Sequence, residues 1–179
     1  MFNKVLIANR GEIALRIIRA CKELNIKTVA IYSECDELSL HTTFADEAIC
    51  IGPPDSINSY LNIAAVISAA ELTNSDAIHP GYGFLSENAE FSKICKESNI
   101  TFIGPDSQTI NSMGHKSTAI STMKKAGIPV IPGSHAIVND IAEGLKVSKK
   151  LGFPIIIKAA SGGGGRGMRM VEKESDFEN

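Results

Sequence analysis

Short apolar runs alternate with amphipathic, helix-length segments through the first hundred residues, and this alternation restricts the fold more than any other feature. The apolar runs occupy residues 5–8, 28–32, 48–51, 77–79 and 101–103. Residues 13–25, 60–70 and 87–97 carry apolar side chains at helical spacing instead. A strand, a helix and a second strand in succession form a right-handed unit with parallel strands. The pattern therefore predicts an α/β fold built on a parallel sheet.

The length of 179 residues allows one domain of about 100–200 residues and part of a second. Glycine and proline interrupt the chain at residues 104–105 and 127–133, with a helix expected between them at 115–126. We place the boundary there, with a first domain at 1–113 and a second, incomplete one at 114–179. In the second domain we expect a helix from Asp140 to Gly152, strands at 154–158 and 168–171, and the opening of another helix in 172–179.

Composition argues against several classes of function. The 18 basic and 20 acidic residues nearly balance and form no basic run, so neither nucleic acid nor an anionic membrane is the expected partner. No apolar run approaches the roughly 18 residues of a membrane span, and the N-terminus does not look like a signal peptide. The cysteines show no zinc-ligand spacing, so we expect free thiols in a reducing compartment. Small-molecule chemistry is the favoured class.

The strongest local signal is Lys158 followed by five glycines within six positions, 162–167. Backbone N–H groups that no Cβ covers, together with a lysine, suit phosphate oxygens. A P-loop is excluded because its lysine follows the glycines and precedes a helix. The G-x-G-x-x-G match is only formal, since a strand is expected next. We interpret 161–167 as a flap between two strands, with Lys158 on the same face as Ile156; a flexible surface loop is the alternative.

A second candidate site follows the strand at 77–79 and leads into a helix. Ligands of open α/β sheets bind beyond the carboxyl ends of the strands, where His79, Tyr82 and the N–H groups of Gly81 and Gly83 would lie. A tight turn with a core aromatic explains these residues equally well. A lone histidine at a strand end is more often a hydrogen-bonded structural residue than a base.

The turn after the first strand, residues 9–12, also leaves the carboxyl end of a strand and leads into a helix, like the turn after the strand at 77–79. One glycine is too few for a dinucleotide fingerprint, so this segment reads as a strand-to-helix turn with Glu12 at the helix N-terminus. Arg16, Arg19 and Glu23 share the polar face of the following helix, and a solvated face is the default interpretation. Lys116, at the start of the helix after the boundary, is equally compatible with plain surface.

Five blocks of sequence together resemble the N-terminal portion of biotin carboxylase, the ATP-grasp subunit of acetyl-CoA carboxylase. They stand in the family's order and spacing at residues 7–16 (IANRGEIALR), 59–62 (SYLN), 79–88 (HPGYGFLSEN), 102–105 (FIGP) and 158–168 (KAASGGGGRGM). The resemblance implies a Rossmann-like N-terminal domain followed by the beginning of an ATP-grasp domain. It also implies an enzyme that forms carboxyphosphate from ATP and bicarbonate, with Mg²⁺ or Mn²⁺, and carboxylates biotin on a carrier protein.

The same resemblance implies roles for individual residues. Lys116 and Lys158 would contact the ATP phosphates, with the flap over them. Tyr82 and Gly83 would lie near the biotin and bicarbonate pocket. The remaining matched positions are the flap glycines Gly163, Gly164 and Gly165, and the homodimer contacts Arg16, Arg19 and Glu23. The sequence departs from the family at His115, where aspartate is usual, and at Ala160 and Ser161, where one more glycine is common.

The family's metal-binding glutamates, adenine-clasping strand and bicarbonate-holding arginines come later than residue 179, so no catalytic or metal residue is assigned and the chain alone is expected to be inactive. Implied partners are the biotin carboxyl carrier protein and carboxyltransferase subunits, in the cytoplasm or the plastid stroma. The alternatives are the same module in pyruvate, propionyl-CoA or methylcrotonyl-CoA carboxylase, and a non-catalytic fragment that dimerises or binds nucleotide. A dinucleotide oxidoreductase lacks its glycine fingerprint here.

Overall fold

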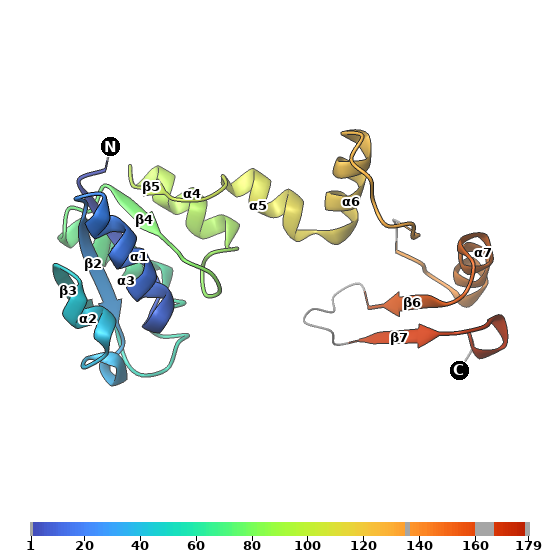
Figure 1. The fold of residues 1–179 in the computed structure, drawn as a ribbon, viewed down its shortest axis with the longest axis horizontal. Helices are drawn as coiled ribbons and strands as arrows, with labels where there is room; N and C mark the ends of the chain where they lie inside the picture. Colours follow the sequence, from blue (N-terminus) through green and yellow to red (C-terminus); the bar gives the residue numbers. More distant parts are fainter. Residues whose placement is uncertain (1, 135–136, 160–166, 178–179) are drawn as a thin grey trace. The chain divides into compact units, whose positions relative to one another are not determined.

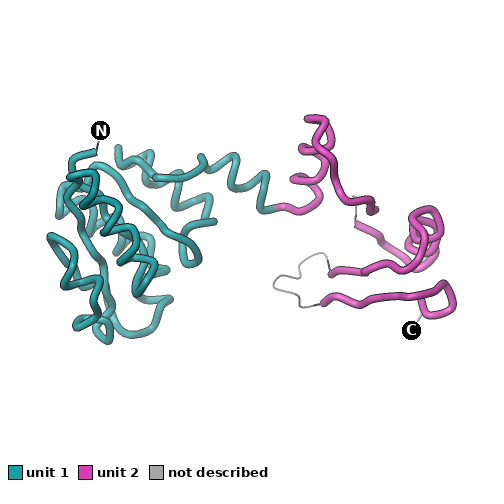
Figure 2. The backbone as a smooth tube through the Cα atoms, viewed as in Figure 1, with its two compact units in different colours: residues 1–114 teal, residues 115–179 magenta. Residues whose placement is uncertain are grey.

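The structure, a computed structural model, describes residues 2–134, 137–159 and 167–177. The chain divides into two compact units, Met1–Gly114 (unit 1) and His115–Asn179 (unit 2), which Figure 2 draws in teal and magenta.

Unit 1 is built on a five-stranded sheet in the order β3-β2-β1-β4-β5, in which every neighbouring pair is parallel (Figure 1). This confirms the α/β fold with a parallel sheet that the alternation predicted. Each strand lies within one residue of its predicted position at either end. The strands are β1 (Lys4–Ile7), β2 (Lys27–Tyr32), β3 (Glu47–Cys50), β4 (Ala77–His79) and β5 (Thr101–Phe102).

The central strands are apolar along most of their length because both faces of the sheet are covered. Leu6, Val29 and Ile78 point into one core cluster, which also holds Phe91. The neighbouring residues in the strands, with Val5 and Ala77 among them, belong to clusters on the other side together with α1 (Gly11–Glu23). Burial of both faces explains why these strands read as continuous apolar runs.

Side chains of asparagine set the start of two helices. Asn62 accepts a hydrogen bond from the N–H of Ala65, and α3 (Ile63–Leu72) begins directly after it. Asn88 accepts from Phe91 in the same way before α4 (Ala89–Glu97). An N-cap side chain satisfies backbone N–H groups that have no partner within the helix. Both helices therefore start two to three residues later than the apolar pattern predicted.

The sequence pattern missed three short elements. They are the 3₁₀ turn η1 (Glu34–Asp36), α2 (Leu40–Phe44) and α5 (Ser107–Gly114). The first two span a single turn or little more, and α5 buries only Ile110, so none carries a long apolar stripe.

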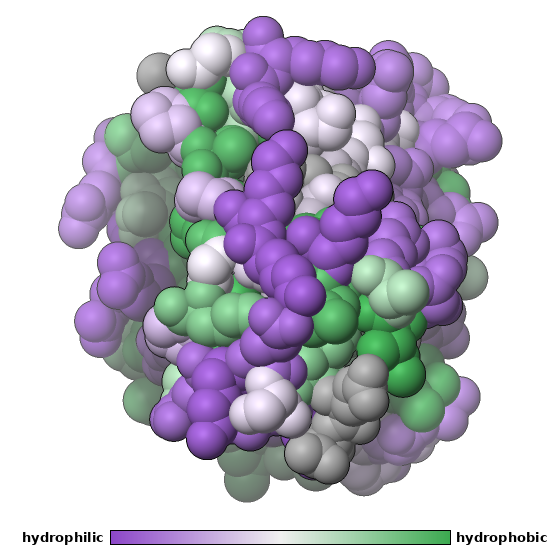
Figure 3. Space-filling model, turned by 90° about the vertical axis from the view of Figure 1, so that its right-hand side faces the viewer, coloured by the Kyte–Doolittle hydropathy of each residue, from purple (hydrophilic) through white to green (hydrophobic). Residues whose placement is uncertain are grey.

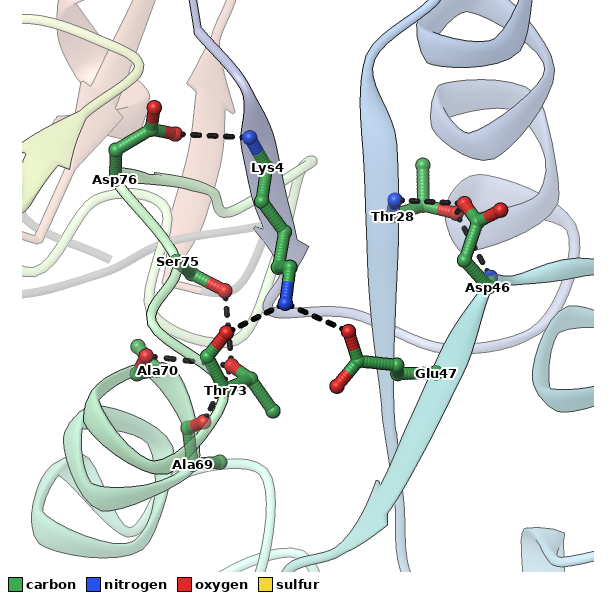
Figure 4. Close-up of polar contacts among 9 residues, drawn as sticks. All are labelled: Lys4, Thr28, Asp46, Glu47, Ala69, Ala70, Thr73, Ser75 and Asp76. Carbon is green, nitrogen blue, oxygen red and sulfur yellow. Dashed lines mark hydrogen bonds and ion pairs between the residues drawn. The ribbon is translucent and has the colours of Figure 1, made fainter.

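Polar groups tie the strands together at their amino ends, the edge away from the candidate site (Figure 4). The ammonium group of Lys4 lies 2.6 Å from the carboxylate of Glu47 on β3 and donates to the carbonyl of Thr73 at 2.7 Å. The carboxylate of Asp76 accepts from the backbone N–H of Lys4 at 3.1 Å. These contacts link segments more than 40 residues apart and connect β1 to β3 and to the turn before β4.

Unit 2 contains α6 (Lys116–Lys125), α7 (Ile141–Leu151) and the antiparallel hairpin of β6 (Ile155–Lys158) and β7 (Met168–Val171). The hairpin and both helices were predicted. Asp140 caps α7 by accepting from Glu143 at 2.7 Å. Of the helix opening predicted in the tail, the structure describes the 3₁₀ turn η2 (Glu174–Asp176), and residues 178 and 179 lie outside the described residues.

Candidate active site at the carboxyl ends of β1 and β4

Strands β1 and β4 of unit 1 end side by side, at the point where the order in which the chain adds strands to the sheet reverses. From β1 the chain continues to β2 on one side, and β4 on the other side continues to β5. Loops that leave the carboxyl ends of such strands diverge and open a crevice. Here they form a hollow of about 410 Å³, lined by Asn9, Arg10, Gly11, Glu12, Ile13, Tyr82, Gly83 and Phe84. The two turns singled out in the sequence thus meet at one site.

Asn9 holds the two turns together. Its side chain is buried, and the amide donates to the carbonyls of Pro80 at 2.8 Å and Tyr82 at 2.9 Å. Gly81 lies between these two carbonyls with a φ of +65°, and a Cβ there would come within 2.8 Å of the Asn9 amide nitrogen. Glycine is therefore required at position 81 both for its conformation and for space.

Tyr82 is exposed but has a defined polar partner. Its hydroxyl donates to the carboxylate of Glu12 in the first turn of α1, over 3.0 Å. This hydrogen bond, together with the negative charge of Glu12, raises the pKa of the Tyr82 phenol, and the charge of Arg16 opposes the shift. Glu12 lies in the first helical turn as predicted, but it also engages the opposite turn of the hollow.

Arg10 stands over an aromatic and acidic cluster that the sequence pattern did not reveal. Its guanidinium group lies 2.9 Å from the carboxylate of Asp36 and 5.6 Å from the centre of the Tyr60 ring, which stacks on Phe84 at 5.0 Å. Burial raises the pKa of Asp36, but the Tyr60 hydroxyl bond and the Arg10 charge outweigh it and lower that pKa overall. Arg10, Tyr60 and Phe84 belong to three different blocks of the resemblance, residues 7–16, 59–62 and 79–88, but nothing in the sequence indicated that they would meet.

The structure limits what His79 and Gly81 can do. The Nδ1 atom of His79 accepts the N–H of Gly81 at 3.0 Å, and burial lowers the pKa of the imidazole. His79 is thus a neutral, hydrogen-bonded residue, which agrees with its interpretation from the sequence as a structural residue and not a base. The expectation that the N–H of Gly81 faces a ligand is wrong, because that group is already bonded.

Arg16, Arg19 and Glu23 all lie exposed on α1, on the helix face that the spacing predicted. In unit 2, Lys116 is the first residue of α6 and Lys158 the last of β6. Lys158 pairs with Met168 and Ile156 with Met170 across the hairpin, so Lys158 and Ile156 share a face as expected. Gly163, Gly164 and Gly165 lie outside the described residues.

The described part of the chain offers no group of three or more histidine, cysteine, aspartate or glutamate side chains that could hold a metal ion. We assign no metal ligand to these residues. Among the described helices, none has the length and apolar character needed to cross a lipid bilayer.

Comparison with protein families identifies both units. Residues 1–110 match the model of the biotin carboxylase N-terminal domain. The chain belongs to the biotin carboxylase family. Residues 115–179 match the ATP-binding domain of the carbamoyl-phosphate synthase large chain, so the second family match begins where unit 2 begins.

Relatives of known identity extend the match over the whole chain. It is 60% identical to biotin carboxylase of Haemophilus influenzae over 179 residues, 99% of this chain and 40% of that protein. The Campylobacter jejuni biotin carboxylase in complex with β-γ-ATP superposes with a TM-score of 0.92 at 52% identity, over 99% of this chain and 40% of that one.

The biotin carboxylase domain dimer of Hydrogenobacter thermophilus 2-oxoglutarate carboxylase, solved with MgADP, ADP and bicarbonate, gives a TM-score of 0.89 at 48% identity. That match covers 99% of this chain and 39% of the other. The chain therefore spans about two fifths of the length of the biotin carboxylases it matches.

Proposed function

We propose that this chain forms the N-terminal domain and the beginning of the ATP-grasp domain of a biotin carboxylase, divided at residues 1–113 and 114–179. The enzyme would use ATP and bicarbonate to form carboxyphosphate and carboxylate biotin held on a carrier protein. The observation that carries the proposal is the succession of two family matches, 1–110 and 115–179, in one chain. The division into compact units after Gly114 supports the boundary.

Lys116 and Lys158 are proposed to bind the ATP phosphates, with Gly163, Gly164 and Gly165 as the flap over them. Both ammonium groups are exposed and sit at element ends, where their long side chains can reach a ligand. Positive charge placed against a triphosphate in a site that excludes water stabilises the charge that shifts during phosphoryl transfer. Mg²⁺ or Mn²⁺ would neutralise further phosphate charge, held by residues that we do not assign.

The exposed face of the hairpin suits this role. Ile156, Met168 and Met170 lie beside Lys158 on that face and are all more than half exposed. Figure 3 shows hydrophobic residues, in green, interspersed with hydrophilic residues, in purple, on the face it draws. Apolar side chains beside an ammonium group lower the local dielectric once a ligand covers them, which strengthens its attraction for phosphate.

Tyr82 and Gly83 are proposed to form part of the pocket for biotin and bicarbonate. They line the hollow at the switch point of the sheet, the usual place for ligands in this fold. Arg16, Arg19 and Glu23 are proposed as homodimer contacts. They form an exposed charged face on α1, and the relative from Hydrogenobacter thermophilus is described as a dimer.

We further propose that the enzyme serves acetyl-CoA carboxylase, with biotin carboxyl carrier protein and carboxyltransferase subunits as partners, in the cytoplasm or the plastid stroma. The supporting observation is the 60% identity to a protein named simply biotin carboxylase, against 49% for a 2-oxoglutarate carboxylase small subunit. The second candidate is the same module in a carboxylase for another acceptor. Purification of the endogenous complex and identification of its transferase subunit separates the two.

The test of activity uses a completed carboxylase, in which residues 1–179 precede the part of the Haemophilus influenzae biotin carboxylase that lies beyond its matched segment. We expect ATP hydrolysis that requires both bicarbonate and biotin, and none from the 179-residue chain alone. Lys158→Met should lower this rate at least about tenfold, whereas the matched control Lys125→Met, at the exposed end of α6, should not. A folded, nucleotide-binding chimera without biotin-dependent hydrolysis would contradict the proposal.

A further inference from the structure

One buried side chain connects the two turns that form the hollow. Asn9 is 1% exposed, and its amide group reaches across more than 70 residues of sequence to the carbonyls of Pro80 and Tyr82. Its side-chain oxygen accepts the N–H of Arg10 at 2.9 Å. Both donor hydrogens and the acceptor are thus in use, so the side chain has one fitted position.

The residue at the other end of the hollow completes this arrangement. Glu12 accepts the Tyr82 hydroxyl, so Tyr82 is held at two places, its backbone carbonyl by Asn9 and its hydroxyl by Glu12. The ring itself is 65% exposed and gains little fixation from packing. Without these two polar contacts, an exposed tyrosine at the tip of a turn would sample several rotamers.

We propose that Asn9 and Glu12 are positioning residues that fix the turn at 80–83 and direct Tyr82 toward the biotin substrate. The inference rests on the proposed function, in which Tyr82 and Gly83 line the biotin pocket. Neither Asn9 nor Glu12 needs to touch the substrate. Because the one hydroxyl hydrogen of Tyr82 is committed to Glu12, a ligand meets this oxygen as an acceptor.

The close approach of Gly81 shows that the turn has little freedom around Asn9. A Cβ at position 81 would lie 2.7 Å from the Ile13 side chain and 2.8 Å from the Asn9 amide nitrogen. By contrast, a Cβ at Gly83 would meet nothing within 4 Å. The turn is therefore packed tightly against Asn9 and against Ile13 of α1 at position 81, and has open space at position 83.

The first experiment measures steady-state kinetics of the completed carboxylase with free biotin. Asn9→Ala and Glu12→Ala should raise KM for biotin about tenfold, the effect of about 1.4 kcal/mol of lost positioning, with KM for ATP unchanged. Glu12→Gln keeps an oxygen that accepts from Tyr82 and should restore most of the affinity. Asn62→Ala removes the capping asparagine of α3, and Glu90→Gln a first-turn glutamate of α4. Neither residue lines the hollow, so both variants should leave KM for biotin unchanged.

The second experiment follows the Tyr82 phenol in the 179-residue chain by NMR of labelled tyrosine. Glu12 raises the pKa of Tyr82 and Arg16 opposes it. If Asn9 holds the turn, Asn9→Ala should bring that pKa down toward the ordinary value of 10, as Glu12→Ala does, because the hydroxyl leaves Glu12. Asn9→Asp keeps the side-chain size and the acceptor for Arg10 but loses the two donors. It should change the pKa of Tyr82 in the same direction as Asn9→Ala, and it replaces that variant if Asn9→Ala does not fold.

An unchanged Tyr82 pKa in both Asn9 variants, or a rise in KM for biotin no larger than that of Asn62→Ala, overturns the positioning role. This result differs from a failure of the proposed function, in which the parent completed carboxylase itself shows no biotin-dependent ATP hydrolysis. In that case the titration of Tyr82 still decides whether Asn9 and Glu12 set the turn.

Discussion

Replacing Tyr60 by phenylalanine removes one hydroxyl group from the core of unit 1 and should strongly lower its stability. Tyr60 is 1% exposed, and its hydroxyl oxygen accepts the backbone N–H of Ser33 at 3.0 Å. The same hydroxyl donates to the carboxylate of Asp36 at 2.7 Å. Phenylalanine keeps the ring and its stacking on Phe84, so the change isolates these two hydrogen bonds.

The expected loss follows from what each partner retains. Ser33 is fully buried, so its N–H has no access to solvent, and an unsatisfied buried donor costs about 1–3 kcal/mol. Asp36 keeps Arg10 and some solvent contact, so its lost hydrogen bond costs about 1 kcal/mol. Together we expect a decrease of about 2–4 kcal/mol in the free energy of unfolding. At a urea m-value of about 2 kcal/mol/M, the unfolding midpoint falls by about 1–2 M.

Urea unfolding of the 179-residue chain measures this change, with Tyr32→Phe as the matched control, because no hydrogen bond of the Tyr32 hydroxyl is found among the described residues. The control should shift the free energy by less than about 0.5 kcal/mol. Burial, with the Asp36 bond and charge, raises the pKa of Tyr60 from 10 to about 12. The wild-type protein should therefore lose stability as pH rises from about 10 to about 12, since the unfolded phenol ionises first. A Tyr60→Phe chain as stable as the control would refute the reasoning.

Three further predictions concern other parts of the chain. Asp140→Ala removes the cap of α7 and should lower the stability of that helix by about 1 kcal/mol, measured as faster hydrogen exchange of its backbone amides. Asp140→Ser should retain the slow exchange, and equal exchange rates in both variants would show that the cap is dispensable. Iodoacetamide at pH 8 should modify only two of the four cysteines in the native chain and all four in urea. The reason is that burial raises the pKa of the other two thiols, that of Cys95 to about 12. More than two rapid modifications of the native chain would contradict this prediction. The protected thiols are Cys21 and Cys95, and the reactive ones are Cys35 and Cys50. Burial lowers the pKa of His41 below 6.5, and its Nδ1 atom has no hydrogen-bond partner in the described structure. The free energy of unfolding should therefore fall as pH drops below about 6.5, because only the unfolded state takes up the proton there. In urea unfolding at pH 5–7, His41→Phe should flatten this dependence, and an unchanged slope would contradict the prediction.

Local pattern was sufficient for most of unit 1. The apolar runs at β1, β2 and β4 predict strands, because a parallel sheet buries both strand faces and favours nearly continuous apolar runs. Helix starts were less accurate. Asn62 and Asn88 determine where α3 and α4 begin, whereas the apolar stripe extends beyond the cap into residues that pack as turns.

The site was predicted in parts but not as an arrangement. Tyr82 and Gly83 were predicted from their place after the strand at 77–79, their role toward biotin from the resemblance, and Glu12 from its place at a helix N-terminus. Nothing in the spacing of residues indicated that Glu12 would accept the hydroxyl of Tyr82, or that Arg10 would cover Tyr60 and Asp36. Contacts between residues 24 to 73 positions apart depend on the order of strands in the sheet, which periodicity does not encode.

The sequence by itself determined the fold class, the family and the candidate phosphate-binding lysines, because these depend on short-range periodicity and on blocks of residues in a fixed order. Only the tertiary structure decided that β1 and β4 lie side by side, and hence that Asn9 reaches the turn of Tyr82. The physical reason is that a hydrogen bond requires atoms within about 3 Å of each other. Neighbouring strands bring such atoms together across 70 residues, whereas a local pattern describes only the residues within one element.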